Sequence, residues 1–174
     1  MNYISKTEKD TYQIAEKLAK KLKGGEIIAL EGDLGAGKTT FVKGLARAFG
    51  IKQHVTSPTF VLMKVYCIEN KEYRIKPAYR SSKSECRNIE LSLPTEARRA
   101  NVGIKNLVHV DCYRLDEPQE LFYLGIEEYL NKPDIIVVIE WADKIKEYLK
   151  KFKKVIWIKI KIKKNIRDFI INNL

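Results

Sequence analysis

The stretch EIIALEGDLGAGKTTFVKGLARAFG, residues 26–50, constrains the fold more than any other part of this chain. Its first six residues form a largely apolar run that is typical of a buried strand. Its last part has apolar residues at helical spacing before Gly50, and a loop with three glycines joins the two segments. A buried strand that leads through such a loop into a helix is typical of α/β proteins, so we expect a sheet covered by helices.

The loop has the spacing Gly-x-x-x-x-Gly-Lys-Thr, from Gly32 to Thr39, which is the P-loop pattern. Glycines let successive backbone N–H groups turn inward around an anion, and the following helix directs its positive end toward that anion. Lys38 would reach the terminal phosphates of a nucleotide, and Thr39 would place its hydroxyl on Mg²⁺. A simple glycine turn with a surface lysine does not explain a Lys-Thr pair at the start of a helix. The pattern therefore predicts binding of a nucleotide with Mg²⁺.

Segments typical of strands and helices alternate along the rest of the chain. The predicted strands cover 60–68, 106–111 and 134–140, and the predicted helices cover 5–25, 117–130 and 142–152. We expect Ser5 and Glu8 to form a capping box at the start of the first helix. This order favours a P-loop NTPase-like three-layer α/β fold, with a mostly parallel central sheet and helices on both faces.

The C-terminal residues form two segments, and the second of them has two possible interpretations. Residues 154–164 alternate apolar residues with lysine, which indicates a strand with one wet face at an edge of the sheet. Residues 165–174 fit either a last strand or a short helix.

Residues 69–105 are polar and lack a clear period, so we expect a long irregular insert within a single domain that spans residues 1–174. The formal net charge of +11 is uneven. Residues 144–174 hold eleven basic residues against two acidic ones, and residues 67–106 hold nine against five. Such excess favours an acidic protein or a nucleic acid as partner, and an ordinary solvated surface remains the alternative.

Composition excludes several classes of protein. No apolar run approaches the roughly 18 residues that a membrane-spanning helix needs, and the first residues lack a signal-peptide pattern. Cys67, Cys86 and Cys112 are odd in number and widely spaced, which indicates neither a disulfide framework nor a zinc site. We expect a soluble, cytoplasmic protein.

Two acidic residues close apolar strands, Asp111 after LVHV and Glu140 after IIVVI. Ligands bind at strand ends in sheets of this kind, and nucleotide-bound Mg²⁺ takes a carboxylate there. One carboxylate would contact the metal and the other would position the attacking water, although either residue fits a helix cap instead. His109 lies on the same side of its strand as Asp111 and fits a structural role better than a catalytic one. Trp141 fits the core or a pocket wall.

Five segments occur in an order that resembles the TsaE family, also called YjeE. They are GDLGAGKTTFVKGLARAFG, VTSPTF, HVDCYRL, ELFYLGIEEYL and IEWADKI, and the resemblance covers most of the chain outside 67–105. It implies a small ATPase of bacterial tRNA threonylcarbamoyladenosine biosynthesis, with ATP and Mg²⁺ as cofactors. It also implies that hydrolysis is coupled to a TsaB–TsaD complex that modifies adenosine 37 of tRNA, with the ATPase contacting tRNA indirectly or directly.

The same resemblance implies roles for individual residues. Thr39 and Glu140 would bind the metal, Asp111 would act near the terminal phosphate or its water, and Lys38 would complete the catalytic set. Thr59 in SPTF (57–60) would be the polar sensor of a switch-like segment, and the adenine would lie near Glu8 and Lys164. The implied nucleotide contacts are Gly35, Ala36, Gly37, Lys38, Thr39, Thr40, Thr59, Asp111 and Trp141.

The chain departs from the family in one place and leaves room for other readings. The connection from Phe60 to His109 has 48 intervening residues, where relatives usually have a short hairpin. NKPD (131–134) matches a guanine-reading motif of GTPases, yet it precedes a strand instead of following one. A small P-loop kinase would need an acceptor site, which no segment resembles. An RNA-binding module without activity would leave the P-loop unexplained.

Overall fold

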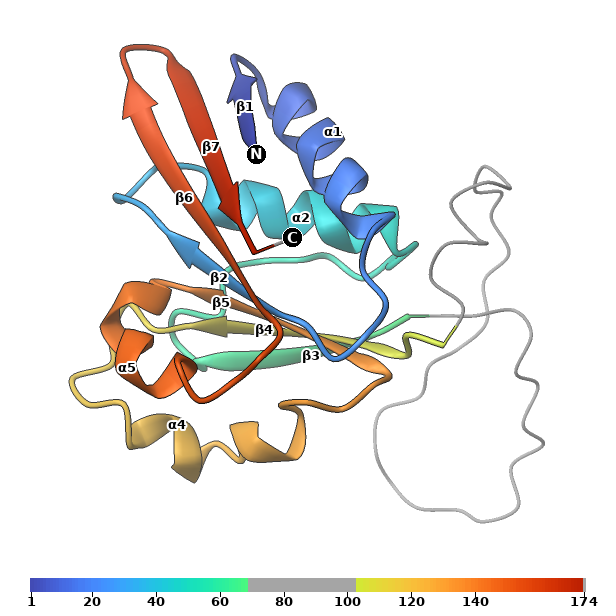
Figure 1. Cartoon of the computed structure of the whole chain (residues 1–174), viewed down its shortest axis with the longest axis vertical. Coiled ribbons are helices and arrows are strands. Elements are labelled where there is room, and N and C mark those ends of the chain that lie inside the picture. The colour runs from blue at the N-terminus through green and yellow to red at the C-terminus, as the bar shows by residue number, and fades with distance from the viewer. Residues whose placement is uncertain (69–102, 174) are drawn as a thin grey trace.

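The computed structural model describes residues 1–68 and 103–173, and Figure 1 shows the arrangement of their elements. The strands are β1 (Asn2–Ser5), β2 (Ile27–Glu31), β3 (Met63–Cys67), β4 (Asn106–Asp111), β5 (Ile135–Glu140), β6 (Val155–Lys163) and β7 (Ile166–Asn172). The α-helices are α1 (Glu8–Ala19), α2 (Lys38–Ala48), α4 (Glu120–Tyr123) and α5 (Lys146–Leu149). Short 3-10 helices cover η1 (Ile126–Glu128) and η2 (Ala142–Ile145).

One sheet runs through the described part of the chain in the order β1-β7-β6-β2-β5-β4-β3. Its centre is parallel, because β2 pairs with β5 and β6, and β4 pairs with β5. Its margins are antiparallel, where β3 joins β4 and where β7 joins β6 and β1. The prediction of a mostly parallel central sheet is confirmed.

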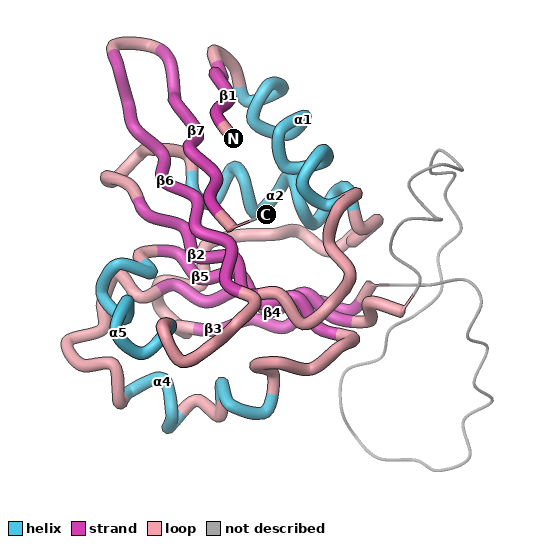
Figure 2. The backbone as a smooth tube through the Cα atoms, viewed as in Figure 1, coloured by secondary structure: helices cyan, strands magenta, loops and turns pink. Residues whose placement is uncertain are grey.

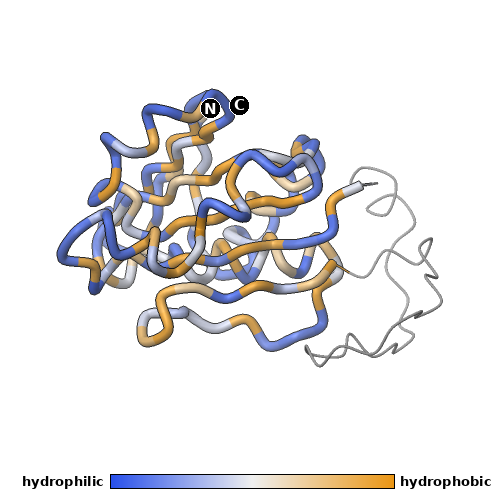
Figure 3. The backbone as a smooth tube through the Cα atoms, turned by 90° about the horizontal axis from the view of Figure 1, so that it is seen from below, coloured by the Kyte–Doolittle hydropathy of each residue, from blue (hydrophilic) through white to orange (hydrophobic). Residues whose placement is uncertain are grey.

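The sheet lies between two layers of helices (Figure 2). α1 and α2 cover one face, and α4, η1, η2 and α5 cover the other. Side chains alternate along each strand, so Ile28 and Leu30 of β2 join the core under α1 and α2, while Ile27 and Ala29 join the second core. Apolar residues follow the central strands in Figure 3, as expected for strands that are buried on both faces. The three-layer prediction is confirmed.

The helix predicted over 117–130 is broken. α4 ends at Tyr123, and Gly125 has a left-handed φ of 69° before η1 begins at Ile126. Glycine adopts this conformation without steric cost, and it cannot continue a right-handed helix. Apolar spacing alone did not distinguish one helix from two short ones, because Leu121 and Ile126 are buried in the same core.

The capping box of the first helix is real but was assigned to the wrong residues. The Thr7 side chain accepts from the Asp10 backbone N–H at 3.2 Å, and Asp10 Oδ2 accepts from the Thr7 backbone N–H at 2.9 Å. Ser5 instead ends β1, where its hydroxyl shares a buried hydrogen bond with Thr11. β1 was not predicted, because four residues are too few for an alternating pattern to be recognised.

The prediction that β6 lies at an edge of the sheet is wrong. Residues 166–172 form β7, which pairs antiparallel with β6, and β1 pairs with the outer side of β7. The strand alternative for the C-terminal segment is therefore correct. The prediction that one face of β6 is exposed to solvent is correct, since Lys159 and Lys161 are exposed while Ile158 and Ile160 are buried.

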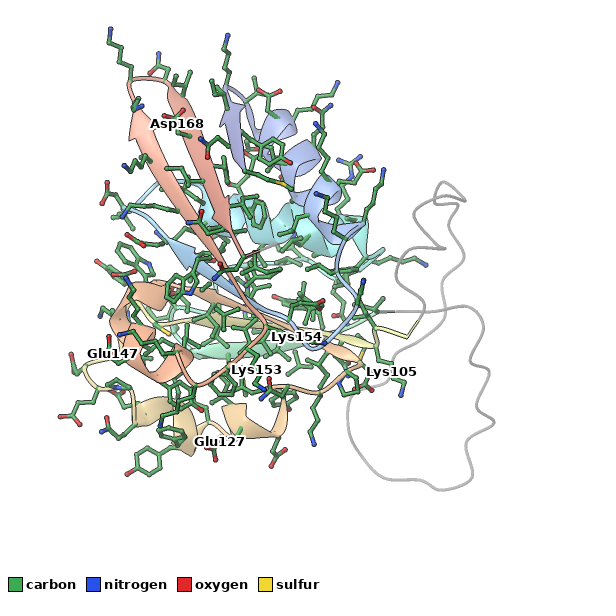
Figure 4. The ribbon with its side chains drawn as sticks, viewed as in Figure 1. Lys105, Glu127, Glu147, Lys153, Lys154 and Asp168 are labelled. Carbon is green, nitrogen blue, oxygen red and sulfur yellow. The ribbon has the colours of Figure 1, made fainter. Side chains whose placement is uncertain are left out.

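The basic excess of residues 144–174 is not one patch. Lys153 and Lys154 precede β6, whereas Asp168 lies toward the tip of the β6–β7 hairpin, near the opposite end of that strand (Figure 4). The nine residues of β6 separate these ends by about 30 Å, at about 3.3 Å per residue. A small molecule therefore cannot contact all of these basic residues at once.

The predicted insert lies mostly outside the described residues, together with Cys86. The described chain resumes at Gly103, and the Lys105 backbone N–H donates to the Asp134 carbonyl at 2.7 Å as β4 begins. At the other border, β3 begins at Met63 and not at residue 60, because Val61 and Leu62 close a turn onto the Pro58 carbonyl. Among the described residues, no helix is long and apolar enough to cross a membrane.

Candidate nucleotide-binding site

The glycine loop joins the end of β2 to the first turn of α2. Gly35 has a φ of 77° and Gly37 a φ of 98°, conformations that side-chain-bearing residues rarely adopt. Gly37 is also the N-cap of α2, and no side chain caps this helix. Backbone N–H groups of a glycine loop and the positive end of a helix thus meet at one point, which is the arrangement that binds phosphate.

Lys38 is folded into the loop. Its Nζ donates to the carbonyls of Gly32 at 2.7 Å and Asp33 at 2.8 Å. The same nitrogen lies 3.8 Å from the centroid of the Trp141 ring, which contributes a cation–π contact. Trp141 follows β5 with a φ of 57°, so a left-handed backbone residue turns the indole over the lysine.

Burial lowers the pKa of Lys38, and the negative charges of Glu140 and Asp111 oppose that shift. The lysine thus keeps its cation at the mouth of the glycine loop, with two carboxylates near enough to favour its charged form.

Thr39 and Glu140 lie against each other where α2 crosses the end of β5. The Thr39 hydroxyl donates to Glu140 Oε1 at 2.8 Å, with Oε2 at 3.1 Å. His109 on β4 contacts the same carboxylate, with 2.8 Å between its Nε2 and Glu140 Oε1. His109 is entirely buried and Glu140 is 3% exposed.

Asp111 is the register partner of Glu140 at the end of the neighbouring strand. Its Oδ2 accepts from the hydroxyls of Ser57 and Thr59, both at 2.6 Å, and these two hydroxyls lie 2.5 Å apart. Its Oδ1 accepts from the Tyr113 backbone N–H at 3.0 Å. The SPTF segment is therefore attached to the strand end through one carboxylate.

These groups surround one cavity of about 380 Å³. It is lined by Leu34, Gly35, Gly37, Lys38, Thr39, Thr40, Ser57, Thr59, Asp111, Tyr113, Glu140, Trp141 and Arg167. Of the residues expected to contact nucleotide, Ala36 is not in the lining. Its side chain is buried in the core, and its backbone N–H donates to the Asp33 carbonyl at 3.1 Å.

Four lining residues were missed from the sequence: Leu34, Ser57, Tyr113 and Arg167. Ser57 and Tyr113 stand beside expected residues, so proximity in sequence was an available signal. Arg167 lies on β7, and a Cβ placed on Gly37 would be 3.2 Å from its Nε. No sequence pattern connects these two residues. Glu8 and Lys164, expected near adenine, do not line the cavity, and that placement stays a prediction.

The NKPD segment lies away from the cavity. It precedes β5, whereas Glu140 ends that strand, and six residues of strand separate the two by about 20 Å. Asn131 has a left-handed φ of 59°, as expected for a turn. The segment therefore lies at the opposite end of β5 from the cavity, and none of its residues lines the cavity.

The oxygen atoms of Thr39 and Glu140 fit Mg²⁺ that is shared with a nucleotide. No group of three or more histidine, cysteine or acidic side chains in the described ranges could hold a metal by itself. Mg²⁺ commonly takes one or two protein oxygens and completes its shell with phosphate and water. One hydroxyl and one carboxylate, next to a phosphate loop, match that requirement.

Comparisons with known proteins agree on one family. The family model described as "Threonylcarbamoyl adenosine biosynthesis protein TsaE" matches residues 5–101 and 94–169. The tRNA threonylcarbamoyladenosine biosynthesis protein TsaE of Bacillus subtilis is 35% identical over 140 residues, which are 80% of this chain and 65% of that protein. The Aquifex aeolicus protein of the same name is 34% identical over 160 residues, 87% of this chain and 95% of that one.

A solved structure supports the same assignment. The crystal structure of Bacillus subtilis YdiB superposes with a TM-score of 0.63 at 28% identity, covering 97% of this chain and 82% of that chain. The family model and the similar sequences point to the same family, and the solved structure has the same fold. The chain therefore belongs to the TsaE family of threonylcarbamoyl adenosine biosynthesis proteins.

Proposed function

We propose that this chain binds ATP with Mg²⁺ in the cavity, hydrolyses the ATP, and thereby supports formation of threonylcarbamoyladenosine at position 37 of tRNA. The observation that carries the ATPase part is the hydrogen bond between Thr39 and Glu140. It joins the hydroxyl of the P-loop to a strand-end carboxylate, and this pair is what a nucleotide-bound Mg²⁺ requires. The role in tRNA modification rests on the family.

Each side chain has a defined task in this proposal. The loop N–H groups and the N-terminus of α2 hold the phosphates, and Lys38 leaves the Gly32 and Asp33 carbonyls to contact the terminal phosphate oxygens. Thr39 and Glu140 hold Mg²⁺, which would neutralise developing charge on those oxygens when bound.

Asp111 is placed to orient the attacking water. It stands beside Glu140 at the strand ends, it lines the cavity, and its carboxylate already accepts from two hydroxyls. A carboxylate within hydrogen-bond reach of a water can hold it in line and take its proton. Thr59 links this carboxylate to the SPTF segment, so the segment can respond to the contents of the cavity.

The proposed partners are TsaB and TsaD, the proposed substrate of the pathway is tRNA, and the proposed compartment is the cytoplasm. Family membership supports a role in tRNA threonylcarbamoyladenosine biosynthesis. The lysine-rich ends of β6 add positive charge that favours a polyanion or an acidic protein nearby.

The first experiment measures phosphate release by the purified chain with Mg²⁺ and no added acceptor, using ATP and GTP in separate and competing assays. We expect release from ATP that stops in EDTA and is lost in Lys38→Ala, which lacks the cation at the phosphates. Hydrolysis of GTP in preference to ATP would favour a GTPase-like switch. Turnover that requires a small-molecule acceptor would favour a kinase.

The second experiment tests the pathway. Purified TsaB, TsaD and tRNA are combined with this chain, ATP and a preformed activated threonylcarbamoyl donor, and the modified nucleoside is measured after digestion. We expect formation to depend on this chain and on Lys38. A wild-type ATPase that leaves modification unchanged would contradict the pathway role while leaving the ATPase proposal intact.

A further inference from the structure

We propose that His109 is a positioning residue for the metal site. Through an Nε2–H hydrogen bond it holds the Glu140 carboxylate in the orientation that receives Mg²⁺, and so sets the metal affinity of the nucleotide complex. The inference rests on the proposed function, because it assigns a role within the same site.

The geometry places His109 behind the carboxylate, away from the cavity. β4 and β5 are parallel neighbours, and His109 is paired in register with Val138, two residues before Glu140. Its ring reaches diagonally along the sheet to Glu140 Oε1 at 2.8 Å. It is fully buried and does not line the cavity, so any effect on nucleotide or metal must pass through Glu140.

The chemistry of the pair identifies the donor. A carboxylate that is to bind Mg²⁺ must be ionised and then only accepts hydrogen bonds, so in the proposed site His109 donates through Nε2. His109 Nδ1 is buried and finds no partner within residues 1–68 and 103–173. The contact with Glu140 is thus the one hydrogen bond of the ring to the described residues.

The second donor to Glu140 cannot replace this one. Thr39 also donates to Oε1, but its hydroxyl is itself a proposed metal ligand. Its hydrogen must reorient when its oxygen faces a cation, whereas the His109 donor has no competing task. Hydrogen bonds from behind a ligand fix its orientation, and their loss typically lowers metal affinity or activity by about 10–100-fold.

A merely structural histidine would fill volume without needing a donor, and two substitutions separate these roles. His109→Leu introduces an apolar side chain of similar size and removes the N–H donor. His109→Gln keeps an N–H that can reach Glu140. Both are measured in the full chain by titrating Mg²⁺ into protein saturated with a fluorescent, non-hydrolysable ATP analogue, with analogue affinity in EDTA as the control.

We expect His109→Leu to raise the Mg²⁺ concentration at half-saturation by about 10–100-fold, with analogue affinity in EDTA unchanged. We expect His109→Gln to restore most of the wild-type value. In a Glu140→Gln background, His109→Leu should add little further loss, since the two residues act through one contact. Equal Mg²⁺ dependence of His109→Leu and wild type would overturn the proposal, and so would equal losses in the Leu and Gln variants.

A second measurement does not depend on the variants folding. Nitrogen-15 NMR of the histidine rings in the wild-type, metal-free protein reports the protonated nitrogen of His109. A ring that carries a proton on Nε2 supports the proposal, and a ring that is protonated on Nδ1 alone overturns it. A wild-type protein whose analogue binding ignores Mg²⁺ would instead contradict the proposed function, while the NMR result would still stand.

Discussion

Two corners of the cavity hold one carboxylate each, and they hold it differently. In the proposed metal corner, formed by Thr39 and Glu140 with the buried His109 beneath them, both donors to the carboxylate come from regular elements, α2 and β4. In the switch corner, formed by Ser57, Thr59 and Asp111, both hydroxyl donors come from the loop between α2 and β3. Yet Asp111 and Glu140 are register partners, and each is 3% exposed.

This difference between the donors fits the two separate roles that we propose for Glu140 and Asp111. A carboxylate held by packed elements keeps one orientation, which suits a metal ligand. A carboxylate held by loop hydroxyls can be released when the loop moves, which suits the proposed role of Asp111 in accepting a hydrogen bond from the attacking water. The predictions below test this contrast between a fixed and a releasable acid.

The largest effect is expected from Glu140→Ala in the metal corner. The change removes a metal oxygen and leaves the Thr39 and His109 donors buried without their acceptor. We expect Mg²⁺-dependent ATP hydrolysis to fall by more than about 100-fold, beyond the effect of losing an outer hydrogen bond. Steady-state phosphate release measures it, and near-normal turnover would show that the corner does not hold the metal.

Asp111→Asn in the switch corner should have the next largest effect. The amide keeps the shape of the side chain and removes the charge that orients water. We expect turnover to fall by about 100-fold, at the low end for loss of an acid–base group, while ATP affinity stays nearly unchanged. Turnover and equilibrium binding are measured on the same preparation. A parallel loss of thermal stability and activity would indicate a structural role instead.

Ser57→Ala and Thr59→Ala should each be milder, because the other hydroxyl still donates to Asp111 Oδ2. A hydrogen bond to a charged group contributes about 1.5–3 kcal/mol when nothing replaces it. Because the remaining hydroxyl replaces part of that contribution, we expect a smaller effect for each single change, at most about a tenfold loss of turnover, which is about 1.4 kcal/mol. The double variant should lose more than the product of the two. Strict additivity would mean that the hydroxyls act independently and not as alternative donors.

The smallest effect on turnover at saturating ATP is expected from Thr7→Ala, because Thr7 does not line the cavity. It removes the N-cap of α1, which should lower the free energy of unfolding by about 1 kcal/mol. Denaturant unfolding measures the loss, and turnover per folded molecule should remain at the wild-type value. Any change in Mg²⁺ dependence here would show that the corners respond to global stability, which would weaken the contrast between them.

The sequence predicted those site residues that lie close together along the chain or that directly follow an apolar strand. The spacing of Gly32, Gly37, Lys38 and Thr39 needs one strand, one turn and one helix, all of them local. Asp111 and Glu140 were predicted because each ends an apolar run, and parallel strand ends meet at one edge. These predictions required no knowledge of which strands are neighbours.

The features that the sequence did not predict depend mostly on which strands lie side by side in the sheet. Arg167 reaches Gly37 because β7 folds back along β6, and the edge position predicted for β6 was wrong for the same reason. An alternating strand has the same pattern whether or not another strand pairs with it, since side-chain alternation reports the faces of a sheet and not its order. The helix break at Gly125 was likewise invisible to apolar spacing.

The sequence by itself determined the three-layer fold, the phosphate loop and the two strand-end acids, because local spacing and hydrophobic burial specify them. The tertiary structure alone decided the partners of those acids. β4 lies beside β5, so the buried His109 faces Glu140, and the turn after Pro58 brings Ser57 and Thr59 onto Asp111. A hydrogen bond between residues 31 or 52 positions apart leaves no periodic trace in a chain, since it is set by packing and by the low dielectric of a buried site.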